Sequence, residues 1–209
     1  MRILHLSDLH FGHHDERLAA GLAADIASQD PELVVVSGDF TQRGTEEEFI
    51  RAREFLDSLH VPVFAVPGNH DVPSRDLVRR FLNPYGYYRT YIAKDLEPFL
   101  EHDGVAIAGL KTSRRMRAEL NWAHGTISED QLDQLETRFA RASPGAVRVV
   151  VAHHPLLQPS TETQVPMRLV KRADLALATF ARLGVRLVLS GHFHLSYVRR
   201  HEHSGEVSE

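Results

Sequence analysis

The chain contains six short apolar runs, and each of them ends in small or polar residues. They span residues 3–6, 33–36, 61–66, 105–110, 147–152 and 185–189. Apolar runs of roughly four to eight residues bounded by turn-forming residues are typical of buried strands. We therefore expect these segments to build the central sheet structure of the protein.

Helix-like stretches separate the apolar runs, at residues 15–28, 45–59, 128–142 and 169–183. Thr45 with Glu48, and Ser128 with Gln131, fit capping boxes that satisfy free N–H groups at a helix start. Gly184 is a helix-stop residue. Alternation of strands and helices predicts a layered α/β fold with right-handed crossovers, in which ligands bind beyond the carboxyl ends of the strands.

The remaining segments carry weaker patterns. Residues 73–99 and 112–125 are rich in Arg, Tyr and Pro, and we expect them to be irregular and to cover one edge of the site. Residues 195–200 are strand-like, and the polar tail 201–209 is expected to fray. At 209 residues the chain is long enough for one full hydrophobic core, so we predict a single domain over residues 1–200.

Composition narrows the chemistry. The chain has no cysteine, so a transition metal would be held by nitrogen and oxygen ligands alone. A formal net charge of −4 argues against a general nucleic-acid binder, although a nuclease stays possible. No stretch approaches the roughly 20 apolar residues of a membrane helix, and the amino-terminal residues do not form a signal peptide. We therefore expect a cytoplasmic protein without a membrane partner.

Metal-ligand residue types follow five of the six apolar runs. They are Asp8 and His10, then Asp39, then Asn69 and His70, then His153 and His154, and finally His192 and His194. Because the ends of parallel strands converge on one rim, these residues are expected to meet although they lie far apart in the sequence. Gly38, Gly68 and Gly191 each precede a candidate ligand, where a Cβ would hinder a tight turn or close approach.

The candidate ligands lie in five short motifs: Asp8-Leu9-His10, Gly38-Asp39, Gly68-Asn69-His70-Asp71, His153-His154-Pro155 and Gly191-His192-Phe193-His194. In sequence and in order, these resemble the five motifs of the calcineurin-like metallophosphoesterase superfamily. The subgroup most similar in appearance is the bacterial class III cyclic-nucleotide phosphodiesterases and their glycerophosphodiesterase relatives. The resemblance implies central β-sheets in a β-sandwich, flanked by helices, with a metal site at the carboxyl ends of the strands.

The resemblance also implies a ligand set for two metal ions. Asp8, His10 and His194 would hold one ion, Asn69, His153 and His192 would hold the other, and Asp39 would bridge the two. A bridging carboxylate offsets the repulsion between two cations about 3.5–4 Å apart. The mixed imidazole and carboxylate set suits Mn, Fe, Zn or Co.

His70 and Asp71 are candidate catalytic residues, and the candidates for substrate binding are Asn69, His70, Arg43 and His154. The resemblance gives His70 a role at the phosphate or leaving group, and Asp71 either orients His70 or caps the following turn. Arg43 matches the spacing of a phosphate-binding arginine in the protein serine/threonine phosphatase branch. His154 either reaches substrate or caps its strand, and Asn69 is expected to contact substrate as well as metal.

The implied function is hydrolysis of a phosphodiester, such as a cyclic nucleotide or another small phosphodiester, by attack of metal-bound hydroxide. The alternative functions are those of a DNA-repair-type nuclease, of a pyrophosphatase of nucleotide-sugar lipids and, more remotely, of a non-catalytic interaction scaffold. Superfamily members commonly continue beyond the last histidine motif, so the chain is either a minimal form or a fragment. An uncovered strand edge there invites pairing with a second copy, as in a homodimer.

Overall fold

The computed structural model describes residues 1–114, 124–159 and 167–201. The elements in chain order are β1 (Ile3–Leu6), α1 (Glu16–Gln29), β2 (Leu33–Val36), α2 (Glu46–Ser58), β3 (Val63–Ala65), α3 (Leu77–Leu82), α4 (Gly86–Tyr91), β4 (Phe99–His102), β5 (Val105–Leu110), α5 (Glu129–Ala140), β6 (Val147–Ala152), α6 (Ala173–Arg182) and β7 (Val185–Leu189). None of the helices in these ranges is long and apolar enough to cross a membrane.

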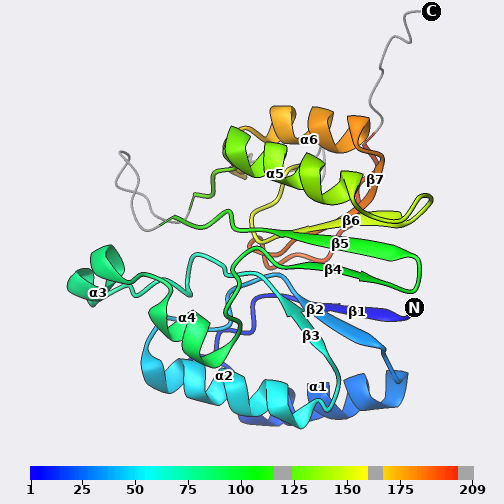
Figure 1. Cartoon of the computed structure of the whole chain (residues 1–209). Coiled ribbons are helices and arrows are strands. Elements are labelled where there is room, and N and C mark those ends of the chain that lie inside the picture. Colours follow the sequence, from blue (N-terminus) through cyan, green and yellow to red (C-terminus); the bar gives the residue numbers. More distant parts are fainter. Residues whose placement is uncertain (115–123, 160–166, 202–209) are drawn as a thin grey trace, which may run out of the picture.

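The strands form two sheets that lie face to face between two layers of helices (Figure 1). The first sheet has the order β1-β2-β3 and is parallel throughout. The second has the order β4-β5-β6-β7, with β4 antiparallel to β5 and the others parallel. Helices α1, α2 and α4 cover the outer face of the first sheet, and α5 and α6 cover the second. The predicted layered α/β fold with a β-sandwich is confirmed.

Alternate residues of β2 show how the layers are held. Val34 and Val36 pack toward the helices of the first sheet, whereas Leu33 and Val35 pack into the core between the two sheets. Successive strand side chains point to opposite faces, so a strand buried on both sides needs an unbroken apolar run. All four residues are fully buried, as that argument requires.

Both predicted capping boxes are present. The Thr45 hydroxyl accepts the backbone N–H of Glu48 at the start of α2, and the Glu48 carboxylate accepts the N–H of Thr45 in return. Ser128 and Gln131 repeat the pattern at α5. Gly184 follows α6 with a φ of 66°, which is the left-handed conformation of a helix stop.

Strand β4 was absent from the sequence expectation: its first residue, Phe99, ends the 73–99 segment that we expected to be irregular, and residues 100–102 were assigned to no element. A hairpin with Asp103 and Gly104 at its turn joins β4 to β5, and both residues have positive φ, at 48° and 73°. An Asp-Gly pair is a strong signal for a two-residue hairpin turn, because both central residues need that conformation. This signal was available in the sequence.

The expectation of an irregular 73–99 segment was also wrong for α3 and α4. Asp76 begins α3, since its side chain accepts the N–H of Arg79, and the chain then forms two six-residue helices. Two elements are shorter than predicted. Strand β3 covers Val63–Ala65 rather than residues 61–66. Helix α6 begins at Ala173 rather than at residue 169, because Arg172 has a φ of 67°, which is not helical.

The strand expected at 195–200 does not form. These residues have no ladder partner, and the ladder partner of β7 among the described residues is β6. Much of the 112–125 segment and nearly all of the 201–209 tail lie outside the described residues.

Candidate metal centre

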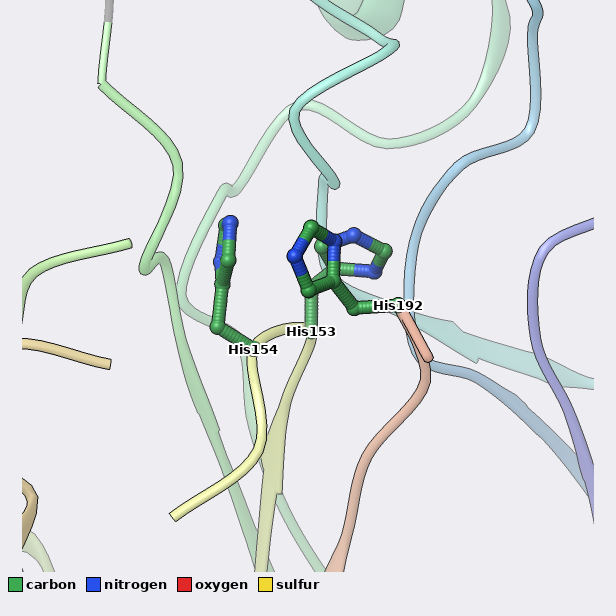
Figure 2. A group of neighbouring side chains, drawn as sticks. All are labelled: His153, His154 and His192. Carbon is green, nitrogen blue, oxygen red and sulfur yellow. The ribbon is translucent and has the colours of Figure 1, made fainter. Parts of the chain in front are cut away.

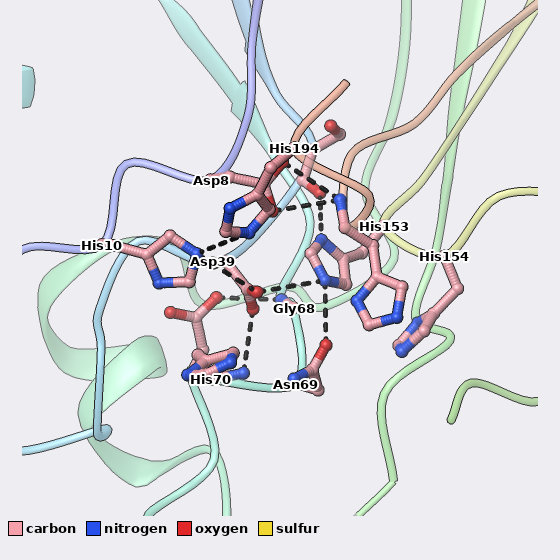
Figure 3. Close-up of polar contacts among 12 residues, drawn as sticks. Asp8, His10, Asp39, Gly68, Asn69, His70, His153, His154 and His194 are labelled. Atoms are coloured by element: carbon pink, nitrogen blue, oxygen red, sulfur yellow. Dashed lines mark hydrogen bonds and ion pairs between the residues drawn. The ribbon is translucent and has the colours of Figure 1, made fainter. Parts of the chain in front are cut away.

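The loops that follow β1, β2, β3, β6 and β7 meet at one end of the sandwich (Figure 3). The first two loops continue side by side beyond their strands. The N–H of Asp8 donates to the carbonyl of Gly38, and that of His10 donates to the carbonyl of Asp39. The parallel pairing of β1 and β2 thus carries the candidate ligands forward together.

The first group of donors consists of Asp8, His10 and His194, whose ligand atoms all lie within 4.8 Å of one another. The Nε2 atoms of His10 and His194 are 3.1 Å apart, and His194 Nε2 is 3.6 Å from Asp8 Oδ1. Metal–ligand bonds of about 2.0–2.2 Å place neighbouring donors about 3 Å apart. The spacing of these three side chains therefore fits a single cation.

The second group contains Asn69, His153 and His192. His153 Nε2 lies 3.0 Å from Asn69 Oδ1, and the rings of His153 and His192 are 5.1 Å apart (Figure 2). The other ring nitrogen of His153 donates to the carbonyl of Ser37 at 2.9 Å, because a carbonyl can only accept. Metal-binding histidines are usually oriented by such a bond, which directs Nε2 to the ion.

Asp39 lies between the two groups. Its Oδ2 is 3.3 Å from His153 Nε2 and 3.8 Å from His10 Nε2, and its Oδ1 accepts the N–H of His70 at 2.8 Å. The side chain is 1% exposed. A carboxylate in this position is within reach of a cation in either group.

Each group takes donors from both sheets. Asp8, His10 and Asn69 follow strands of the first sheet, whereas His153, His192 and His194 follow β6 and β7 of the second. The site therefore spans the two halves of the sandwich at their open end.

Burial and charge act against each other at Asp39 and His153. Burial disfavours both charged forms, but the interaction with Asp39 outweighs it and raises the pKa of His153 to about 9. Burial likewise opposes ionisation of Asp39, while the charge and hydrogen bond of His153 hold the pKa of Asp39 below its usual range. In the metal-free protein the two form a buried ion pair.

Two other histidines are shifted in the opposite direction. Burial lowers the pKa of His10, despite the nearby carboxylate of Asp39. Burial, and then the charge of His153, lower the pKa of His192 to about 4. Both rings are therefore neutral near pH 7, which is the form that binds metal.

Gly68 is required by its closeness to Asp39. A Cβ on Gly68 would lie 2.1 Å from Asp39 Oδ1, and a Cβ on Gly38 would lie 2.7 Å from the backbone nitrogen of Gly68. Gly191 has the same relation to Asp8, at 2.6 Å from Oδ2. These contacts agree with the steric role that the sequence predicted for the three glycines.

Several candidate ligands have left-handed backbone conformations. Positive φ angles occur at Asp8 (55°), His10 (47°), Asp39 (54°), His192 (74°) and His194 (53°). Such residues cost on the order of 1 kcal/mol each and persist where the surrounding structure holds them, often at functional sites. Sequence patterns missed this feature, since aspartate and histidine adopt it only in context.

His70 and Asp71 have different surroundings. The Nδ1 of His70 donates to the carbonyl of Gln42 at 2.7 Å, and its ring lies edge-on to His10 at 4.8 Å. The fully buried Asp71 carboxylate accepts the N–H and hydroxyl of Thr41 and the N–H of Gly68. These partners precede Asp71, so the hydrogen bonds tie the loop after β3 to the loop after β2, while the carbonyl of Gln42 holds the His70 ring. The two expected roles of Asp71, orienting His70 and capping the following turn, stay predictions.

Burial, followed by the charge of Asp39, raises the pKa of Asp71 to about 7. Thr41 was not singled out from the sequence, although it joins the loops after β2 and β3 through Asp71 and the carbonyl of His70. Its place two residues after Asp39 was the available signal.

His154 is buried beside the second group. Its Nδ1 is hydrogen bonded to the Thr112 hydroxyl at 2.7 Å, and its ring lies 4.5 Å from that of His192. Its ligand atom also clusters with those of His153 and His192. Arg43 is exposed, and its backbone N–H donates to Glu48. The substrate-binding roles of His154 and Arg43 stay predictions.

The fold and the two donor groups define a layered α/β protein with a candidate metal centre at its strand ends. The family model described as calcineurin-like phosphoesterase matches residues 1–196, and the chain belongs to that family. A solved dimetal phosphatase from Danio rerio has the same fold, with a TM-score of 0.66 and 14% identity over 93% of this chain and 82% of that one.

Two curated relatives are described as phosphodiesterases. A probable cyclic nucleotide phosphodiesterase from Synechococcus is 26% identical over 181 residues, which are 87% of this chain and 65% of that protein. A probable glycerophosphodiester phosphodiesterase from Arcobacter nitrofigilis is 29% identical over 126 residues, which are 60% of this chain and 43% of that protein. The chain thus spans less than two thirds of the length of these relatives.

Replacing Gly68 by alanine is expected to abolish stoichiometric metal binding, because the new Cβ displaces the Asp39 carboxylate. Overpacking of this kind also costs about 1–3 kcal/mol of stability. The measurements are metal content by plasma mass spectrometry and urea unfolding. Gly21→Ala is the matched control: nothing lies within 4 Å of its Cβ position on α1, so it should stabilise by about 0.5–1 kcal/mol. Full metal content in Gly68→Ala would contradict the prediction.

His153 of the metal-free protein is expected to stay protonated up to about pH 9, above the ordinary value of 6.5. Its pairing with Asp39 therefore stabilises the metal-free fold fully below pH 6.5, and this stabilisation is lost as the pH rises through about 9. Metal must displace the proton, so affinity should rise with pH over the same window. Nitrogen-15 NMR titration of the imidazoles measures the midpoint, and a midpoint below 6.5 would refute the pairing.

Proposed function

We propose that the protein is a metal-dependent phosphodiesterase with a dinuclear centre bridged by Asp39. The observation that carries this proposal is the position of Asp39 Oδ2 between two donor groups, 3.3 Å from His153 Nε2 and 3.8 Å from His10 Nε2. A buried carboxylate needs compensation by positive charge. Two cations, one in each group, supply that compensation more completely than a single protonated histidine.

The donor set fits the metal ions that the family implies. Asp8, His10 and His194 would hold one ion, and Asn69, His153 and His192 would hold the other, with Mn, Fe, Zn or Co as candidates. When bound, the two ions acidify a water nucleophile and polarise the phosphoryl group. The depressed pKa values of His10 and His192 support this use, since both rings offer lone pairs at neutral pH.

His70 is proposed as the group that acts on the leaving alkoxide. Its Nδ1 proton is engaged by the carbonyl of Gln42, which fixes the ring and leaves Nε2 for the reaction. Its backbone N–H holds Asp39, so the side chain starts from a residue that is anchored to the centre of the site. In the doubly protonated imidazolium form Nε2 also carries a proton, and the positioned ring can deliver that proton to a poor leaving group and end as the neutral Nδ1–H tautomer.

The proposed substrate is a small phosphodiester, in agreement with the descriptions of the Synechococcus and Arcobacter relatives. A formal net charge of −4 makes a nucleic-acid substrate less favourable. We propose residues 1–200 as one domain, and a homodimer stays a prediction.

Asp39→Asn is expected to reduce hydrolysis of bis(p-nitrophenyl) phosphate with added manganese by about 10²–10³-fold, as losses of electrostatic stabilisation of this kind do. The amide retains an acceptor for the His70 N–H but not the bridging charge, so metal content should fall in parallel. The control Asp57→Asn changes an exposed carboxylate on α2 that pairs with Arg53, and it should leave both measurements unchanged. Wild-type activity in Asp39→Asn would contradict the proposal that Asp39 bridges the two metal ions.

His70→Ala is expected to lower kcat by roughly 10²–10⁴-fold while both metal equivalents remain bound. If His70 protonates the leaving group, the loss should be larger for alkyl phosphodiesters than for nitrophenyl esters, whose leaving groups need little protonation. His102→Ala, an exposed histidine on β4, is the matched control. Loss of metal from His70→Ala would instead identify His70 as a metal ligand. An equal loss of kcat with alkyl and nitrophenyl esters would exclude proton transfer by His70.

A further inference from the structure

Helix α3 has its apolar and charged sides reversed relative to an ordinary surface helix. Leu77, Val78 and Leu82 are 50%, 70% and 81% exposed, and Phe81 beside them is 39% exposed. At 3.6 residues per turn these four positions occupy an arc of about 140° on one side of the helix. We call the surface formed by Leu77, Val78 and Leu82 the α3 apolar face.

The opposite side of α3 carries its arginines, and these turn toward the protein. Arg80 is 3% exposed and donates to the carbonyls of Val72 and Pro73. The guanidinium of Arg79 lies over the ring of Tyr87 at 4.0 Å and pairs with Asp76. A soluble surface helix normally buries its apolar stripe and exposes its charges. The reversal makes the α3 apolar face a candidate contact surface.

The charge around α3 is opposite to that of the whole chain. Residues 73–89 contain four arginines and one aspartate, a formal charge of +3, whereas the chain carries −4. Arg75 and Arg89 are exposed. An apolar face accompanied by exposed arginines is typical of a segment that lies in the interface of an anionic membrane.

The position of α3 connects this face with the metal centre. The chain leaves the site at Asp71 and enters α3 at Leu77, and Figure 1 shows α3 projecting from the body of the protein. Arg80 holds the helix against the loop that carries Asp71, and Ser74 donates its N–H to the carbonyl of Arg43. The apolar face is thus fixed to the loops of the candidate site.

We propose that α3 associates with an anionic lipid surface by inserting the α3 apolar face among the acyl chains. This contact is peripheral, so it agrees with the finding that no described helix spans a membrane, but it goes beyond the sequence expectation of no membrane partner. In this arrangement the exposed Arg75 and Arg89 would pair with the anionic headgroups.

A second copy of the chain is a weaker occupant. Pairing two α3 segments would bring together two regions of charge +3, which repel each other. A stable protein interface also needs about 800 Å² from each partner, more than the exposed side of a six-residue helix offers. An anionic lipid surface has the complementary charge and needs no partner surface of matching shape.

The test is cosedimentation of the full chain with phosphatidylcholine vesicles and with vesicles that also contain phosphatidylglycerol. Wild-type protein should bind the anionic vesicles. The double variant Val78→Ser with Leu82→Ser should lower the partition coefficient at least about tenfold. Leu18→Ser, which changes a leucine on α1 that is 73% exposed, is the matched control and should bind as wild type does. Unfolding midpoints confirm that each variant is folded.

The readout is binding, so it is independent of the proposed phosphodiesterase activity. Failure of wild-type protein to bind either vesicle overturns the proposal, as does equal binding by the double variant. A wild-type dimer that the double variant converts to a monomer, without vesicle binding, would assign the face to contact between copies and overturn it as well.

Discussion

The buried carboxylate of Asp39 is the constraint around which this end of the protein is organised. Burying an isolated ionised carboxylate costs free energy, so the carboxylate needs neighbours that supply positive charge and hydrogen bonds. His153 supplies a charge, the His70 backbone supplies an N–H, and Gly68 supplies the space that a side chain would take. Because these neighbours come from the loops after β3 and β6, while Asp39 itself follows β2, the position of one carboxylate couples segments that are distant in the sequence.

Left-handed backbone conformations at the candidate ligands bring their side chains together around Asp39. Asp8, His10 and Asp39 leave strand geometry within two to four residues of the strand ends, which turns their side chains toward a common point. The hydrogen bonds from Asp8 and His10 to the neighbouring loop hold these turns in place. The conformational cost is therefore met by the same pairing of β1 and β2 that builds the sheet.

The parts of the fold that could be predicted from the sequence are those in which local pattern and tertiary environment agree. The apolar run at 33–36 is buried on both faces, and the Thr45 and Ser128 caps are made within four residues. The candidate metal ligands could be selected from the sequence because suitable residue types coincide with the predicted strand ends. Strand β4 was missed, since two of its four residues are exposed and its pattern is mixed.

The features of the fold and site that were not predicted depend on contacts between residues that are distant in the sequence, and no local sequence pattern indicates such contacts. Helix α3 carries its leucines outward, so a search for an apolar stripe facing a core does not recognise it as a packed element. The loop-tying role of Asp71 rests on Thr41, thirty residues earlier, and the orientation of His153 rests on the carbonyl of Ser37. A strand at 195–200 was predicted from composition, but a strand needs a neighbour to pair with.

The distribution of donors over both sheets has a further consequence for the whole molecule. Among the described residues, the core between the sheets contains seven buried side chains, and the donor groups close the sandwich at the end beyond it. Cations bound to both donor groups would cross-link the two sheets, which otherwise meet through these apolar contacts. In a cell, the supply of metal would then govern how long each molecule survives proteolysis, and scarcity of metal would lower the amount of the protein.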